Sequence, residues 1–421
     1  MRDPQTLTSD ELLGLVTGAR WFAAKDRVPE EAEVVGVPVE DDLVTLAIVE
    51  VRFGAGTHEH YSVALGADES AAVDAFERPE VASRLASLAG VPAAGAQVRP
   101  LGVEQSNSSV VLDELHVLKL YRRLQAGPNP ELEVLNALAS AGFANAPRLE
   151  GALTTEGPPL ETALASLTAL VPSAGGGWEI TLGAFHDDPS WLPERAWRLG
   201  EVTAGLHAAL ASNDDDPHFA PEEPSSEALG LLAAEIEEEI TSTFASLPQD
   251  DALGAVAHRA EDLRDLVQEL ASVGPSGLAI RTHGDYHLGQ VLWTTDDDWI
   301  VIDFEGEPAR SLPERRRKRS PLRDLAGMTR SFAYAGDVAL LLEGVAAPEG
   351  WVEACREAFL DGYLASADER LLPSSRSGFE RLLQLYELEK LVYELRYETR
   401  NRPEWATIPI VGMLRLLEPV T

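Results

Sequence analysis

The sequence predicts an α+β fold in three successive parts: a small antiparallel-β cap, a β-rich small lobe and a larger, mainly helical lobe. Two stretches, 34–63 and 97–121, are rich in β-branched residues and are broken by turn signals, which is typical of antiparallel strands. From residue 172 onward the pattern is helical, apart from a short β segment at 290–304. We place the cap at 1–90, the small lobe at 91–171 and the large lobe at 172–421.

Composition and charge narrow the class of protein. The chain has 421 residues and is 45% hydrophobic, which is ample for a large core. It contains no run of about 20 apolar residues, so we expect no membrane span. The net charge of 34 − 70 = −36 should repel nucleic acid and anionic membranes.

The N-terminus and the cysteine content bear on location. The N-terminal residues do not resemble a secretory signal. Cys355 is the only cysteine, so no intrachain disulfide can form. Both features fit the reducing cytoplasm, and we predict a cytoplasmic protein. The sequence leaves the oligomeric state open, and a monomer is compatible with it.

The cap shows one candidate outside the main functional signals. His58 and His60 alternate with Glu59 along an expected strand, so the two imidazoles share a face. A metal site and a solvated strand face are both open interpretations, and we favour the second.

The strongest functional signal lies between residues 283 and 305. Asp285 is followed by an amide residue, Gln290, after 290 − 285 = 5 positions, and by Asp303 after 303 − 285 = 18 positions, enough for one β-hairpin. Phosphoryl transfer from ATP to a hydroxyl needs a carboxylate to orient the nucleophile and oxygen ligands for Mg²⁺. This order and spacing therefore predict a kinase. In the alternative interpretation Asp285 is a turn residue and Asp303 a helix cap or surface acid.

These residues resemble a known family. HGDYHLGQVL followed by IDFEGEP resembles the aminoglycoside-phosphotransferase-like kinases, and more narrowly the actinobacterial maltokinases and glucosamine kinases. The resemblance implies a bilobal protein-kinase-like fold with ATP and Mg²⁺ as cofactors. It also implies that Asp285 is the catalytic base and that Gln290 and Asp303 hold Mg²⁺. Further segments match the group's pattern, so that the resemblance covers nearly the whole chain: 20–22, 104–109, 321–327 and 386–405.

Two details of the predicted metal site need comment. Gln290 replaces the Asn of typical kinases, a departure that maltokinases share, and it keeps the amide oxygen. Glu305 lies two residues past Asp303, on the same face if the strand continues. A supporting role at the metal and a structural hydrogen bond are both open for Glu305.

The small lobe should bind the nucleotide. Lys119 lies in the strand-like run VLKLY, and kinases use such a lysine to hold ATP phosphates with a helical glutamate. Glu133 is our first choice of partner and Glu131 the alternative. Taken alone, Lys119 would be a surface lysine. We expect the connector at Val171 to contact adenine through backbone groups.

The phosphate loop is expected at 104–109, although it has no G-x-G-x-x-G. Small polar residues can offer hydroxyl, amide and backbone N–H groups to phosphate. Taken alone, the segment would be an ordinary turn. The residues that we assign to ATP here are Ser106, Asn107, Ser108 and Ser109.

The acceptor site should lie in the C-terminal helices. Tyr386, Lys390, Tyr393 and Tyr397 fall at i, i+4, i+7 and i+11, along one helix face, where aromatic rings can stack on a sugar and lysine can donate to hydroxyls. An ordinary amphipathic helix with half-buried tyrosines is the alternative. The resemblance implies a sugar-binding segment here, and the side chains assigned to the substrate are Lys390, Tyr393, Glu394, Tyr397, Glu398 and Trp405.

Substitutions within this pattern favour one sugar. Tyr286 replaces a leucine beside the base and could narrow the pocket toward a monosaccharide; we assign it and His287 to the substrate. The carboxylates Glu394 and Glu398 would suit an ammonium group. We therefore predict phosphorylation of glucosamine at its 6-hydroxyl, with maltose 1-phosphate synthesis as the alternative. An aminoglycoside antibiotic kinase and a non-catalytic pseudokinase are further alternatives.

Overall fold

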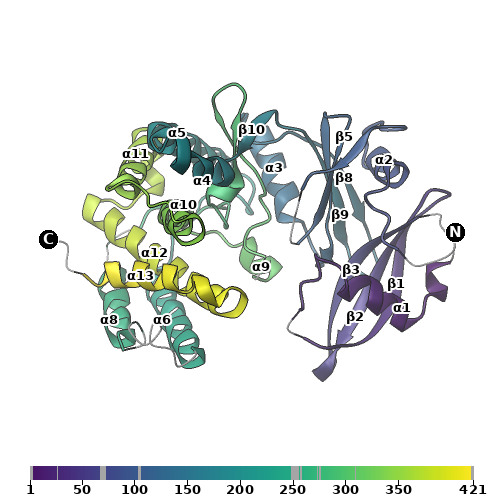
Figure 1. Cartoon of the computed structure of the whole chain (residues 1–421), viewed down its shortest axis with the longest axis horizontal. Helices are drawn as coiled ribbons and strands as arrows, with labels where there is room; N and C mark the ends of the chain where they lie inside the picture. The colour runs from purple at the N-terminus through teal and green to yellow at the C-terminus, as the bar shows by residue number, and fades with distance from the viewer. Residues whose placement is uncertain are drawn as a thin grey trace. The chain divides into compact units, whose positions relative to one another are not determined.

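The computed structural model describes residues 3–25, 27–66, 73–102, 106–247, 256, 258–272, 274, 276–308 and 310–418 (Figure 1). The chain forms two compact units. Unit 1 comprises Met1–Ala139, Ala146–Pro172 and Pro308–Arg315, and unit 2 comprises Ser140–Asn145, Ser173–Glu307 and Arg316–Thr421.

Unit 1 begins with a four-stranded antiparallel sheet in the order β1-β2-β3-β7. Its strands are β1 (Pro29–Glu40), β2 (Val44–Phe53), β3 (Thr57–Gly66) and β7 (Arg123–Leu124), and the helical turns η1 (Pro4–Thr6) and η2 (Gly54–Gly56) and helix α1 (Ser9–Thr17) belong to the same region. Thr8 and Glu11 form a capping box that fixes the start of α1. One face of the sheet packs its apolar side chains with Leu12 and Val16 of α1.

The other face of this sheet shares its core with a second sheet. That sheet is five-stranded and antiparallel, in the order β4-β5-β6-β9-β8. The remaining elements of unit 1 are β4 (Val98–Pro100), β5 (Ser108–Leu112), β6 (His116–Leu120), β8 (Leu149–Thr155), β9 (Thr162–Ala169), α2 (Pro79–Leu88), α3 (Pro130–Ser140) and α9 (Leu312–Arg315). Leu46 and Ile48 of β2 lie in one hydrophobic cluster with Val110 and Leu118.

This shared core joins the predicted cap and the predicted small lobe. Successive residues of β2 are apolar and buried, so both faces of this strand are covered, as in the core of a sandwich. In addition, β7 comes from the small-lobe sequence but pairs with β3 of the cap. Both predicted parts fall within unit 1, so the division at residue 90 does not separate compact units. One segment of unit 1 ends at Pro172, beside the predicted boundary, but unit 1 also contains Pro308–Arg315 and unit 2 contains Ser140–Asn145, so the three-part division stays a prediction.

Unit 2 is mainly helical, with one small sheet in the order β10-β11-β12. The strands are β10 (Ser173–Gly176), β11 (Val291–Thr294) and β12 (Trp299–Val301), with the turn η3 (Leu288–Gln290) before β11. The helices and helical turns are α4 (Gly177–Asp187), α5 (Trp191–Leu210), α6 (Ala228–Ser246), α8 (Ala260–Ala271), α10 (Leu322–Val338), η4 (Ala339–Glu343), α11 (Trp351–Ser366), η5 (Glu369–Leu371), α12 (Arg376–Asn401), η6 (Pro403–Trp405) and α13 (Thr407–Leu416).

Helix α12 organises this unit. It has 26 residues and packs against α6, α8, α10 and α13. None of the described helices combines the length and the apolar character that crossing a bilayer requires. Mixed helices and antiparallel sheets in this order confirm the predicted α+β class.

Candidate active site

The loop that carries Asp285 is fixed by a buried carboxylate from α10. Asp324 is 1% exposed and accepts hydrogen bonds from the backbone N–H groups of His283 (2.8 Å) and Gly284 (3.0 Å). It also contacts Nε2 of His207 at 3.1 Å. Burial would raise the pKa of Asp324, but His207 and the other contacts outweigh burial and lower it. From the sequence, Asp324 is recognised only as part of the segment 321–327, which matches the family's pattern, and no role is predicted for it.

His207 is a core histidine of α5. Its side chain is fully buried, and Nδ1 contacts the hydroxyl of Tyr363 at 3.0 Å. Both ring nitrogens are therefore occupied by structural contacts.

Arg323 provides a second support for the same loop. Its guanidinium donates to the carbonyl oxygen of Gly284 at 3.2 Å and pairs with Glu307 (3.2 Å) and Glu389 (3.4 Å). A close approach completes the packing, because a Cβ at Gly327 would lie 2.4 Å from the carbonyl oxygen of Tyr286. Only glycine lets α10 come this near to the loop.

Asp285 is held ionised by a lysine from α12. Nζ of Lys390 lies 3.2 Å from Oδ1 of Asp285, and Nε2 of His287 lies 3.9 Å from Oδ2. Burial raises the pKa of Asp285, but the charge of Lys390, followed by His287 and His283, outweighs burial and lowers the pKa to about 2. The same contact raises the pKa of Lys390 in spite of its burial. Two residues that lie 105 positions apart in the sequence thus form one ion pair.

His287 lies beside this pair with a partly exposed side chain. Its Nδ1 accepts a hydrogen bond from the N–H of Gly289 at 3.0 Å. Burial lowers its pKa more than Asp285 raises it, which favours the neutral imidazole. Its assignment to the substrate stays a prediction.

Gln290 and Asp303 flank the β11–β12 hairpin and meet at its base. Nε2 of Gln290 donates to Oδ2 of Asp303 at 3.3 Å, and the N–H of Ile302 donates to the carbonyl oxygen of Gln290 at 3.0 Å. The predicted hairpin between Asp285 and Asp303 is therefore present. In this contact the amide nitrogen of Gln290 faces the carboxylate; turning the amide over would bring its oxygen beside Asp303, and two such oxygens fit Mg²⁺, which prefers oxygen ligands.

The backbone of Asp303 supports a functional role. Its φ of 63° lies in the left-handed region, which a non-glycine residue rarely adopts and which is enriched at functional sites. The following residue, Phe304, is buried against the ring of His283 at 5.1 Å between centroids, which anchors this conformation.

The argument for Glu305 is wrong. It required a strand that continues through Asp303, but β12 ends at Val301 and the backbone turns at Asp303. The alternation of side chains therefore does not place Glu305 on the face of Asp303.

The expectation for Tyr286 is also wrong. Its side chain is 2% exposed, and its hydroxyl contacts Oγ1 of Thr203 on α5 at 2.9 Å. The phenol thus packs into the helical core and does not border an acceptor pocket. The sequence showed the bulk of Tyr286 but not the direction of its side chain.

The aromatic face of α12 is present in part. Lys390 lies 4.9 Å from the ring centroid of Tyr393, and the rings of Tyr393 and Tyr397 stack at 6.3 Å. Both tyrosines are half-buried, which fits the sugar-binding hypothesis and the ordinary amphipathic helix alike. Tyr386 is buried, with 6% exposure. Trp405 is half-buried under the guanidinium of Arg402, 4.2 Å from its ring centroid.

The two acidic residues assigned to the substrate are already paired. Glu394 accepts from Arg330 at 2.9 Å. Glu398 is 2% exposed and bonds to Tyr334 (2.6 Å) and Arg402 (2.7 Å). A carboxylate with a matched cation is a poor receptor for an ammonium group, so this part of the prediction is corrected.

In unit 1, an ion pair joins Lys119 to Glu131, the alternative partner, and a role for the first choice, Glu133, stays a prediction. The Nζ–Oε2 distance is 3.3 Å, and Glu131 is buried and also accepts from the hydroxyl of Tyr121 at 2.6 Å. Glu131 lies in the first turn of α3, which aims its carboxylate back at β6. Sequence reasoning could not choose between two glutamates on one helical turn.

The segment predicted to form the phosphate loop, 104–109, is a loop only in part, because β5 begins at Ser108. Ser108 and Ser109 lie in β5, Oδ1 of Asn107 accepts from the backbone N–H of Arg122 at 3.2 Å, and Oγ of Ser108 accepts from Nε of Arg122 at 2.8 Å. These bonds use the acceptor oxygens of Asn107 and Ser108, whereas phosphate would be bound by their N–H and O–H donors, so both roles stay predictions. Ser106 is exposed, and Glu104 and Gln105 lie outside the described residues. Val171 lies half-buried between β9 and β10, and its adenine contact stays a prediction.

Comparison with known proteins places the chain in a family. The profile of the phosphotransferase enzyme family matches residues 97–373, so the chain belongs to this family. The chain is 30% identical over 413 residues to the glucosamine kinase of Streptacidiphilus jiangxiensis, covering 92% of this chain and 89% of that protein. It is 28% identical over 333 residues to the glucosamine kinase of Mycolicibacterium smegmatis, covering 77% and 80%.

Solved structures give the same picture. A crystal structure of a glucosamine kinase superimposes with a TM-score of 0.72 at 25% identity, covering 99% of this chain and 97% of that one. A glucosamine kinase in complex with glucosamine, ADP and inorganic phosphate gives a TM-score of 0.72 at 24% identity, covering 99% and 98%. The predicted protein-kinase-like fold is confirmed.

Proposed function

We propose that the chain is an ATP- and Mg²⁺-dependent sugar kinase that transfers the γ-phosphoryl group to the 6-hydroxyl of glucosamine. The observation that carries the kinase chemistry is the cluster in unit 2, where Asp285 is held ionised by Lys390 and Gln290 lies against Asp303. The choice of glucosamine is supported by the relatives that bear this name.

Asp285 would orient the acceptor hydroxyl. Its Oδ1 is bound to Lys390, whereas Oδ2 accepts no hydrogen bond from any described residue and can receive one from a sugar hydroxyl. With a pKa of about 2, the carboxylate is a weak base, so positioning contributes more than proton removal before transfer. This fits a loose transition state, in which the nucleophile needs little activation.

Asp303 and Gln290 would hold Mg²⁺ through their side-chain oxygens, and the ion would neutralise phosphate charge. Lys119, held by Glu131, would bind the phosphates of ATP. Lys390, Tyr393 and Tyr397 would face the sugar, with one donor and two stacking rings. A cytoplasmic location, where ATP is present, stays a prediction.

ADP release with ATP and Mg²⁺ tests this function, measured with glucosamine, glucose, maltose and kanamycin in turn. We expect turnover on glucosamine and little on maltose or kanamycin. Turnover on maltose alone would overturn the choice of sugar, and no turnover on any sugar would overturn the kinase assignment.

A further inference from the structure

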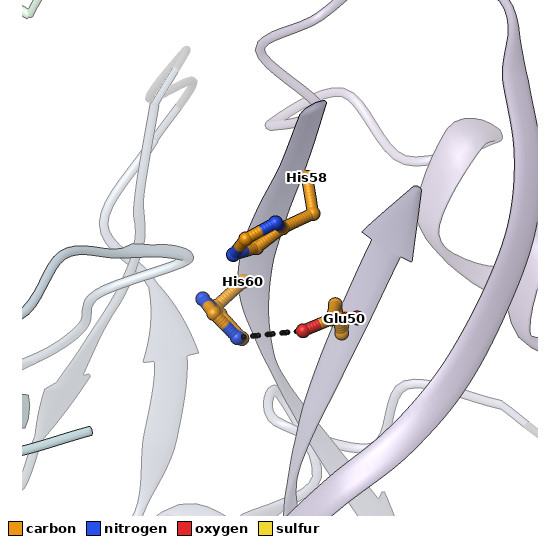
Figure 2. Close-up of side chains that lie close together, drawn as sticks. All are labelled: Glu50, His58 and His60. Carbon is orange, nitrogen blue, oxygen red and sulfur yellow. Dashed lines mark ion pairs between the residues drawn. The ribbon is translucent and has the colours of Figure 1, made fainter. Parts of the chain in front are cut away.

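The register of β2 and β3 brings three potential metal ligands together on the four-stranded sheet (Figure 2). Glu50 is directly opposite His60, and His58 is two residues from His60 on the same strand face. The two imidazole rings lie 5.3 Å apart between centroids. One ligand atom from each of the three side chains lies within 4.8 Å of the other two.

These separations suit a small tetrahedral ion. Bonds of about 2.0–2.1 Å from the ion to nitrogen and oxygen imply about 3.3 Å between neighbouring ligand atoms. Oε2 of Glu50 lies 3.3 Å from Nε2 of His60, so this edge of the tetrahedron already has the required length. A rotation of His58 about its side-chain bonds can close the remaining gap, because its side chain is exposed.

Arg52 holds the carboxylate from behind. Its Nε donates to Oε1 of Glu50 at 2.8 Å, which leaves Oε2 directed at His60. The positive charge of Arg52 is matched by ion pairs with Glu31 (3.3 Å) and with Glu33, so it is not left to repel a cation. A partner that orients a ligand in this way is a usual part of metal sites.

The exposure of the three side chains also suits a metal site. The side chains of Glu50 and His60 are 15% and 18% exposed, whereas the exposed His58 leaves a path for the ion. Within the described ranges, no other group of three such side chains brings its ligand atoms this close.

We propose that Glu50, His58 and His60 bind one divalent transition-metal ion, with Zn²⁺ as the best fit and a water molecule as the fourth ligand. Two imidazoles and one carboxylate favour Zn²⁺ or its neighbours over Mg²⁺ and Ca²⁺, which take oxygen ligands. The ion would link β2 to β3, two neighbouring strands of a sheet that shares its core with β5 and β6. It therefore stabilises unit 1 and takes no part in phosphoryl transfer.

Zinc binding by the full chain without a histidine tag tests this site. The protein is freed of metal with a chelator, and Zn²⁺ is then titrated in excess Mg²⁺, so that sites built from oxygen ligands are filled. We expect one Zn²⁺ per chain and a rise in melting temperature on binding. The variants His58→Gln and His60→Gln should each bind Zn²⁺ at least about tenfold more weakly.

His116→Gln is the matched control, because His116 contacts a single carboxylate, Glu150, also within unit 1. It should bind Zn²⁺ as the unchanged chain does. In the absence of metal, His58→Gln should melt at the same temperature as the unchanged chain, since its exposed imidazole packs into no core. The Co²⁺-loaded chain should show the intense visible absorption of a tetrahedral site, and His58→Gln should lose it.

Three outcomes would each refute the site. The unchanged chain could bind no Zn²⁺ under these conditions, or the two variants could bind it as tightly as the unchanged chain. The control could also lose binding to the same extent as the variants, which would show that the ion binds to scattered histidines. Because these readouts are metal content, spectrum and melting temperature, they do not depend on the proposed kinase activity.

Discussion

Replacing Lys390 by methionine tests the electrostatic argument at the candidate active site. In the unchanged chain, Lys390 and its neighbours lower the pKa of Asp285 from 3.8 to about 2, against the effect of burial. The difference of about 1.8 in pKa corresponds to about 2 kcal/mol, at 1.36 kcal/mol for each unit. Without Lys390, burial dominates and the pKa of Asp285 should rise above its ordinary value.

The sign of the effect on stability follows from linkage. A lowered carboxyl pKa stabilises the folded state above the unfolded pKa of 3.8, and this contribution is lost as the pH falls toward about 2. We therefore expect Lys390→Met to lose at least about 2 kcal/mol of unfolding free energy at pH 7 and to approach the unchanged chain near pH 2. In the same variant, the acidic limb of the pH profile of kcat should move upward by about 2 pH units or more.

Urea unfolding at a series of pH values, together with ADP release over the same range, measures both effects. Lys390→Arg is the control, because it keeps a positive charge beside Asp285 and should retain most of the stability. Equal unfolding free energies of Lys390→Met and the unchanged chain at pH 7 would refute the reasoning.

Three further experiments test the remaining assignments. Asp285→Ala should lower kcat by at least about 100-fold while ATP binding, measured by calorimetry, is kept; full activity in this variant would rule out the site. Asp303→Asn should raise the Mg²⁺ concentration for half-maximal activity at least about tenfold, whereas Glu305→Gln should change it little, and equal effects would contradict the metal assignment. Glu131→Gln should raise the KM for ATP more than Glu133→Gln does, because Glu131 holds Lys119; the reverse order in the kinetics would restore the first choice of partner.

The sequence could predict the site where the chemistry is local. The interval between Asp285, Gln290 and Asp303 is set by one loop and one hairpin, and such short-range geometry follows from residue types and turn signals. The α+β order follows in the same way from the change between strand and helix periodicity. Local patterns could not show that the predicted cap and small lobe form one unit, because β7 pairs with β3 of the cap sheet from a distant position in the chain.

Other features depended on contacts between distant segments. Helical spacing shows that Lys390, Tyr393 and Tyr397 lie along one face of α12, but not what the neighbouring acidic stripe meets. In the structure that stripe is neutralised by arginines, and Glu394 pairs with Arg330 of α10, 64 residues away in sequence. The pattern of one helix contains no information about the charge of its neighbour.

The sequence alone determined the fold class, the family and the loop of Asp285 with its hairpin, because each can be recognised from local patterns of residue types. Only the tertiary structure decided that Lys390 pairs with Asp285, that Glu131 holds Lys119, that Tyr286 is buried, and that Glu50 joins His58 and His60. These outcomes depend on strand register and helix packing, which set the direction of each side chain in space.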